Sequence, residues 1–286
     1  MESKIQPILC CVGDSVAGEP TQFLMERALA ASHCDWRVIT VEVPVEQLAT
    51  ALAGLQAMKF TALRFFPGLQ QVAAELLCAR NSTQDTGDES PGKGKSVAEV
   101  TSAIRVGDAW SCWDNVGHGL VRLIANCSPL KDVVIWAHRD SRLTRSLIAA
   151  LQDVPDRPLR VLWSVEEASV VYPNWVTPTS LEDVYKHLEE LFASAESSQS
   201  LAIIGDGLSN QLELISQMRL EPARLILATN ELLPRNTVNA VWSGSITILT
   251  KSDQVTASEA YDFEKWTGKS ADVDLLRDAY DEYADF

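Results

Sequence analysis

The sequence has little positive charge and no long apolar run. Its 286 residues include 24 Lys and Arg against 39 Asp and Glu, a formal net charge of −15. Such a chain repels a nucleic-acid backbone and an anionic membrane surface alike, so neither is expected as a partner. Its apolar runs are far shorter than the roughly 20 residues that a membrane-spanning helix needs. The first residues lack the pattern of a secretory signal, so we expect a cytoplasmic protein.

Motifs of several common catalytic classes are also absent. The four histidines show no metal-type spacing and no H-E-x-x-H occurs, so no metal site is expected. Neither G-x-S-x-G nor G-x-x-x-x-G-K-[ST] is present, which argues against the common serine hydrolases and P-loop NTPases. The six cysteines contain no C-x-x-C pair and lie mostly in apolar stretches, which predicts buried free thiols in a reducing compartment.

Apolar periodicity predicts an α/β protein whose length suits about two domains. The first half alternates strand-like and helix-like segments, namely 8–12, 21–31, 36–43, 45–58 and 60–66. This order predicts a mostly parallel sheet covered by helices. Residues 80–96 have no side chain that would anchor them in a core, so they are expected to form a surface loop.

The second half repeats the alternation and resembles a doubly wound nucleotide-binding sheet. Expected strands lie at 133–137, 160–164, 201–204, 224–228 and 245–249, and expected helices include 114–127, 181–193, 210–218 and 256–266. The domain boundary is expected near the first of these helices. Gly268 marks the end of the last one. The acidic segment 272–285 is expected to be a solvated helix face or a frayed terminus.

Short motifs near both ends of the chain occur in an order known from one enzyme family. Val12-Gly-Asp-Ser-Val-Ala17, Val41-Glu-Val-Pro44 and Ala51-Leu-Ala-Gly-Leu55 are similar to the opening G-D-P-V-A-H-S-L-S-P segment of shikimate dehydrogenases and the strand and helix after it. Phe263-Glu-Lys-Trp-Thr-Gly268 resembles their closing F-x-x-W-T-G helix. Together these motifs resemble that family over nearly the full chain.

The resemblance implies a two-domain architecture and a hydride-transfer reaction. It places a shikimate-binding α/β domain at 1–115, a Rossmann-like NADP-binding domain with a doubly wound parallel sheet at 116–250, and C-terminal helices at 251–286 that pack back on the first domain. In the family, a Lys in N-V-T-x-P-x-K and an Asp in N-T-D-x-x-G serve the reacting hydroxyl, as general acid–base catalysis requires.

The position of the family's catalytic lysine is apolar in this chain. Aligned on Pro67, the motif N-V-T-x-P-x-K falls on Leu63-Arg-Phe-Phe-Pro-Gly-Leu69, which puts Leu63, Phe65 and Leu69 in place of Asn, Thr and Lys. Leucine cannot take up a proton, and the neighbouring Arg64 stays protonated near neutral pH. The favoured interpretation of these apolar residues is core packing or an apolar cleft wall.

Other substrate-side positions of the family are also changed. Its two carboxylate-binding serines fall on Glu19, which would repel a carboxylate, and on Thr21, which keeps a hydroxyl. An Asn falls on Arg105 and the Gln of the closing helix falls on Ser258. Thr21 therefore stays a candidate for substrate binding.

Asp114 is the one family carboxylate that this chain keeps. It lies in Cys112-Trp-Asp-Asn-Val-Gly117, with Gly117 at the family's offset. Asp114 is thus the candidate catalytic and substrate-binding residue. The alternative is that it only caps the following helix, a role that its position suits equally well.

The cofactor side has lost its phosphate-binding glycines. The segment 134–142 contains none, and its side chains are expected to crowd a pyrophosphate; Arg139 is either a phosphate ligand or part of a solvated helix start. The acidic pair in Ser164-Val-Glu-Glu167 suits a free ribose better than a 2′-phosphate. The loop Gly205-Asp206-Gly207 follows a strand at the edge where ligands bind such sheets, and it is either a cofactor loop or a plain tight turn.

Two functional hypotheses follow from these losses. In the first, the chain is a catalytically degenerate member of the family that acts as a noncatalytic binding or regulatory protein, with NADP, NAD or no cofactor and a small molecule as the candidate ligand. In the second, it is a divergent oxidoreductase that uses NADP or NAD on shikimate or a related hydroxy-carboxylate, with Asp114 as its acid–base group. The sequence does not set the oligomeric state.

Overall fold

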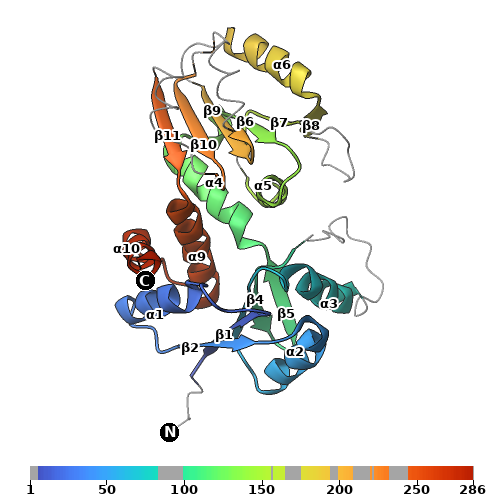
Figure 1. The fold of residues 1–286 in the computed structure, drawn as a ribbon, viewed down its shortest axis with the longest axis vertical. Helices are drawn as coiled ribbons and strands as arrows, with labels where there is room; N and C mark the ends of the chain where they lie inside the picture. The colour runs from blue at the N-terminus through green and yellow to red at the C-terminus, as the bar shows by residue number, and fades with distance from the viewer. Residues whose placement is uncertain are drawn as a thin grey trace. The chain divides into compact units, whose positions relative to one another are not determined.

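The computed structural model describes residues 6–82, 99–155, 157–164, 175–193, 199–208, 220, 222–231 and 244–285. The chain forms two compact units (Figure 1). The first unit contains Met1–Asn115 together with Thr256–Phe286, and the second contains Val116–Val255. The C-terminal segment therefore returns to the unit in which the chain begins.

The first unit contains a five-stranded mixed sheet of order β2-β1-β3-β4-β5. Its strands are β1 (Ile8–Gly13), β2 (Arg37–Glu42), β3 (Ala62–Phe65), β4 (Ser102–Val106) and β5 (Ala109–Trp113). β1 pairs in parallel with β2 and β3, but the β3–β4 and β4–β5 pairs are antiparallel. The prediction of a mostly parallel sheet was wrong here. It missed the β4–β5 hairpin, whose turn uses Gly107 at a φ of 62°.

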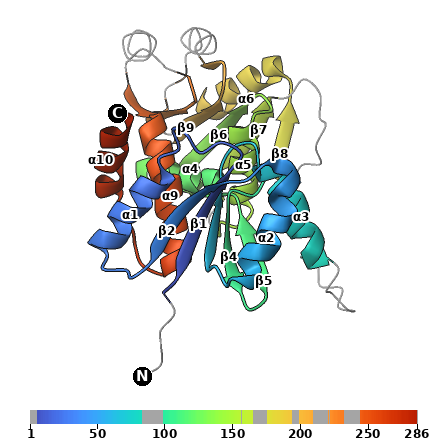
Figure 2. The same ribbon diagram turned by 60° about the horizontal axis from the view of Figure 1, so that its bottom comes forward.

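Helices cover both faces of this sheet. They are α1 (Thr21–Ala31), α2 (Leu48–Ala57) after a short 3₁₀ turn η1 (Val45–Gln47), α3 (Gln70–Ser82), α9 (Lys251–Thr267) and α10 (Val273–Ala284). α2 and α3 pack on one face against Leu63 and Phe65, while α1, α9 and α10 lie on the other side (Figure 2). Successive strand residues point to opposite faces. Arg64, between Leu63 and Phe65, therefore faces α9.

The second unit contains a six-stranded sheet in which every pair is parallel, in the order β11-β10-β9-β6-β7-β8. Its strands are β6 (Val133–His138), β7 (Arg160–Ser164), β8 (Val176–Thr179), β9 (Ser200–Gly205), β10 (Arg224–Ala228) and β11 (Ser245–Leu249). The described helical elements that accompany these strands are α4 (Asn115–Cys127), the 3₁₀ turn η2 (Leu130–Asp132), α5 (Arg142–Leu151) and α6 (Leu181–Ala193). The order starts in the middle at β6 and grows outward in both directions, as in a doubly wound nucleotide-binding sheet.

Several sequence predictions have a definite outcome in the structure. Residues 80–82 end α3 instead of beginning a loop, because Ala73, Ala74 and Leu77 anchor that helix in the core. The rest of the expected loop, the expected helix 210–218 and residues 165–167 lie outside the described residues. Within the described residues, no helix is long and apolar enough to cross a membrane.

The C-terminal elements are regular helices. α9 is longer than expected at its start and is followed by Gly268 at a φ of 69°, the predicted stop. The acidic segment forms α10, whose first turn is capped by Asp272: its carboxylate accepts hydrogen bonds from the backbone N–H groups of Asp274 and Leu275.

Candidate functional site

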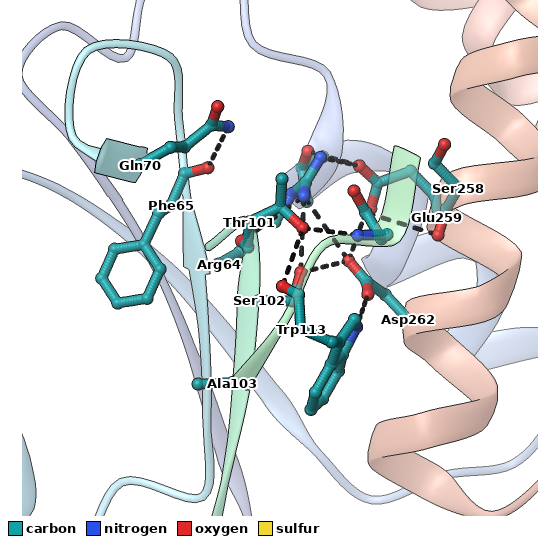
Figure 3. Close-up of polar contacts among 12 residues, drawn as sticks. Arg64, Phe65, Gln70, Thr101, Ser102, Ala103, Trp113, Ser258, Glu259 and Asp262 are labelled. Atoms are coloured by element: carbon teal, nitrogen blue, oxygen red, sulfur yellow. Dashed lines mark hydrogen bonds and ion pairs between the residues drawn. The ribbon is translucent and has the colours of Figure 1, made fainter. Parts of the chain in front are cut away.

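A buried network of polar side chains joins the sheet of the first unit to helix α9 (Figure 3). Arg64 of β3 donates from Nη2 to Glu259 Oε1 at 3.0 Å, and its Nη1 lies 3.6 Å from Asp262 Oδ2. The three side chains are 12%, 1% and 0% exposed, respectively. One guanidinium therefore faces two carboxylates inside the unit.

Asp262 receives the most hydrogen bonds in this network. Ser102 Oγ and Asn115 Nδ2 each donate to Asp262 Oδ2 at 2.6 Å, and Trp113 Nε1 donates to Oδ1 at 2.7 Å. Asn115 Nδ2 also contacts the backbone carbonyl of Ser258 at 3.4 Å. These bonds tie the β4–β5 hairpin and the first residue of α4 to α9 at a single carboxyl group.

Burial and neighbouring charges shift the pKa values of two members of the network. Burial raises the pKa of Asp262 to about 7, helped by the nearby negative charge of Glu259, although Arg64 and the bonds from Ser102 and Trp113 act in the opposite direction. Burial lowers the pKa of Arg64, but the carboxylates around it, Glu19 included, raise it to a net value above normal. Arg64 therefore stays charged, and Asp262 exchanges its proton near neutral pH.

Two acceptor atoms of the network make no hydrogen bond within the described residues. Glu259 Oε2 and Asn115 Oδ1 are buried, and within the described residues neither has a hydrogen-bond partner. A buried acceptor without a partner costs about 1–3 kcal/mol. Thr21, one of the predicted substrate-binding residues, does not relieve this, because its hydroxyl donates to the other oxygen, Oε1, at 3.0 Å.

The predicted substrate-side residues lie around this network. Thr21 is 2% exposed, so its hydroxyl is already used inside the unit. Asp114 is partly buried and lies directly before α4, between Trp113 and Asn115. The structure thus places Asp114 at the N-cap position. Its two chain neighbours, Trp113 and Asn115, both donate hydrogen bonds to the Asp262 carboxyl group. Both of its predicted roles remain predictions.

The apolar residues in the family's lysine motif belong to the core. Leu63, Phe65 and Leu69 are each 0% exposed and form part of the cluster between the sheet, α2 and α3. The core-packing interpretation is confirmed. Packing also explains why position 117 is a glycine, because a Cβ atom there would collide with the backbone oxygen of Ser146 in α5.

In the second unit, the predicted cofactor-side residues come together where the strand order reverses, between β6 and β9. Arg139 follows β6, and Gly205, Asp206 and Gly207 end and follow β9. Arg139 has a φ of 63°, a left-handed conformation that favours glycine, and Gly207 has a φ of 78°. A Cβ atom on Gly207 would meet Arg139 Nη1 at 3.0 Å, so the exposed guanidinium lies against this loop.

The His138 side chain does not crowd an approaching pyrophosphate, contrary to expectation, because it points into the core. Its imidazole is buried beside Trp136, with ring centroids 5.4 Å apart, and Nδ1 lies 3.3 Å from Ser164 Oγ. Burial, aided by the charge of Arg139, lowers the pKa of His138 to about 4. The ring is therefore neutral at physiological pH. It points inward because it continues the alternating face of β6 that carries Trp136.

The sequence reasoning missed the residues that build the polar network. Glu259 and Asp262 are three positions apart in a helix whose other buried residues carry no charge, a pattern that places two carboxylates on one buried face. The sequence around Arg64 gives no sign of its two partners on α9. Across the ranges that the structure describes, no group of three His, Cys, Asp or Glu side chains is placed to hold a metal ion.

No family model and no curated protein matches this sequence. Solved structures of shikimate dehydrogenases do match the fold. The enzyme of Thermus thermophilus, in complex with NADP(H) and shikimate, matches at 15% identity and a TM-score of 0.60, over 97% of this chain and 100% of that one. The enzymes of Mycobacterium tuberculosis and Mycobacterium fortuitum match at 12% and 13% identity and TM-scores of 0.63 and 0.65. These two alignments cover 98% and 96% of this chain and 100% and 97% of the enzymes. The chain therefore has the two-domain fold of the shikimate dehydrogenases.

Proposed function

We propose that this chain keeps the shikimate dehydrogenase fold without the dehydrogenase reaction and acts as a noncatalytic binding or regulatory protein. The observation that carries this proposal is Leu69. The resemblance places the catalytic lysine there, and Leu69 is 0% exposed within the core. Oxidation of an alcohol needs a group that takes its proton, and loss of such a group costs roughly 10²- to 10⁴-fold in rate.

The charges of the first unit support the same conclusion. Arg64 is already paired with Glu259 and Asp262, and the charge of Glu19 also acts on it. One cation thus faces three acidic groups. A substrate carboxylate brought to this region would meet net negative charge in a medium of low dielectric constant, where like charges repel strongly.

The second candidate function is a divergent NAD(P)-dependent oxidoreductase in which Asp114 is the acid–base group. Two observations favour it: Asp114 is only partly buried, and the fold is that of enzymes solved with NADP(H). It also requires a nucleotide to bind at Arg139 and Gly205–Gly207, the residues that lie together at the carboxyl edge of the second sheet.

The test is calorimetric titration of the full chain with NADP⁺, NAD⁺ and shikimate, followed by an absorbance assay of nicotinamide reduction. We expect no shikimate-dependent reduction by the wild type. Turnover that disappears in Asp114→Asn but persists in Asp278→Asn, an exposed control in α10, would establish the oxidoreductase function instead.

Leu69→Lys provides a second test. A lysine side chain at this position would have to enter the core, so we expect it to lower stability by several kcal/mol without restoring activity. Urea denaturation measures the first effect and the nicotinamide assay the second. A stable, active Leu69→Lys protein would mean that the site is a working active site lacking only its base.

A further inference from the structure

The loop after β9 is occupied by the chain's own carboxylate. The backbone N–H of Gly207 donates to Glu231 Oε1, and Glu231 lies shortly after β10. Asp206 is also engaged, since Asn230 Nδ2 donates to its Oδ1 at 3.3 Å. Loop amides in left-handed conformations after a parallel strand form concave sites that bind anions. The Glu231 carboxylate therefore accepts the hydrogen bond of the Gly207 backbone N–H, the donor that an anionic ligand of this loop would use.

A cation lies beside the same amide. The Arg139 guanidinium packs against Gly207, and no ion pair to an acidic side chain is found for it in the described part of the chain. Arg139 also adopts a left-handed backbone conformation, which costs a non-glycine residue on the order of 1 kcal/mol or more. This strain falls at the residue whose guanidinium lies against the loop.

The surroundings of this cation are acidic. Asp206 and Glu231 both act to raise the pKa of the buried His138 and Arg139 acts to lower it, so all three charges lie near this ring. His138 Nε2 is buried and, within the described residues, has no hydrogen-bond partner. The edge therefore combines one cation with two carboxylates. Asp206 and Glu231 repel a phosphate group that approaches Arg139, and the Gly207 N–H already donates its hydrogen bond to Glu231.

We propose that Glu231 is the residue that excludes phosphate-bearing ligands from this edge, by occupying the Gly207 amide and opposing the charge of Arg139. This inference rests on the proposed noncatalytic function and explains how a nucleotide-binding fold rejects its dinucleotide. The ligand chemistry that returns when Glu231 is removed is a phosphate anion, held by Arg139 and the Gly207 amide.

The test is calorimetric titration of the full chain with inorganic pyrophosphate, NAD⁺ and NADP⁺ in low-salt buffer. Glu231→Ala removes both the charge and the acceptor, and we expect it to bind pyrophosphate about tenfold or more tightly than the wild type. Glu231→Gln removes the charge but keeps an acceptor, so a smaller gain is expected. Glu189→Ala, an exposed glutamate in α6, is the matched control and should leave binding unchanged.

A second substitution assigns the gain to this site. Adding Arg139→Ala to Glu231→Ala should abolish the gain, and circular dichroism checks that each variant is folded. NAD⁺ and NADP⁺ should follow pyrophosphate if a dinucleotide uses the same atoms, whereas a gain for pyrophosphate alone identifies a free-phosphate site. Equal affinities of Glu231→Ala and Glu189→Ala, or micromolar binding by the wild type, would overturn the proposal. Shikimate oxidation by the wild type would instead overturn the proposed function.

Discussion

Asp262 makes the stability of the chain depend on pH in a way that one substitution removes. Its carboxyl group is 0% exposed, and its pKa is raised from 3.8 to about 7. The folded chain therefore holds this proton more tightly than the unfolded chain. The stabilising contribution is fully present below pH 3.8 and is lost as the pH rises towards about 7.

The magnitude follows from the size of the shift. Each pH unit between the unfolded and folded pKa values changes the free energy of unfolding by about 1.4 kcal/mol per titrating proton. Over the interval from 3.8 to about 7, Asp262 accounts for a decrease of roughly 4 kcal/mol. Asp262→Asn has no such proton. Its amide oxygen still accepts from Trp113, and its N–H group replaces the oxygen that faces Asn115 Nδ2. The Asn115 amide must turn over to bring its Oδ1, which has no partner among the described residues, to this N–H group.

The assay is urea denaturation of wild type and Asp262→Asn at half-unit steps from pH 5 to pH 8. We expect the difference in unfolding free energy between the two proteins to move in favour of the variant by about 1.4 kcal/mol per pH unit up to about pH 7, then to level off. Asp278→Asn removes one exposed carboxylate from α10 and serves as the control. A pH-independent difference between wild type and Asp262→Asn would refute the reasoning.

Three further predictions concern packing and capping. Arg64→Met leaves two buried carboxylates without their cation and should lower the unfolding free energy by about 3–5 kcal/mol in urea; a loss below about 1 kcal/mol would contradict the buried pair. Gly117→Ala should lower Tm, because its Cβ meets a backbone oxygen, whereas Gly54→Ala in α2, with nothing within 4 Å, should raise stability by up to about 1 kcal/mol. Asp272→Ala should cost about 1 kcal/mol and speed amide exchange in the first turn of α10; unchanged exchange there would argue against the cap.

The fold was largely predictable because its elements obey simple periodicities. The strands of the second unit are continuous apolar runs such as Leu225–Leu227, and their alternation with helices indicates a parallel sheet whatever the loops contain. The β4–β5 hairpin was missed for the opposite reason. Its strands mix Arg105, Ser111 and apolar residues, and what holds them is pairing with β3 and contact with α9, which local sequence does not reveal.

The polar network was unpredictable because it depends on distant partners. The sequence predicts Arg64 only as an inefficient base, and it predicts no role for Glu259. Only the tertiary structure brings their side chains to 3.0 Å. The proximity of Arg139 and Gly207 was easier to predict, because both follow strands whose carboxyl ends meet at one edge in any doubly wound sheet. Glu231, which follows the next strand, was not recognised since its contact is with a backbone N–H.

The bond between Arg64 and Glu259 has a consequence for biosynthesis, since 195 positions separate the two residues. At roughly 5–20 residues per second, a ribosome needs about 10–40 s to travel between them. During that interval the second unit, which is contiguous, is fully synthesised, while the first still lacks the helix that covers Arg64. A nascent chain of this protein must therefore carry an unfinished first unit until helix α9 has been synthesised, and that unit is exposed to chaperones and proteases in this period.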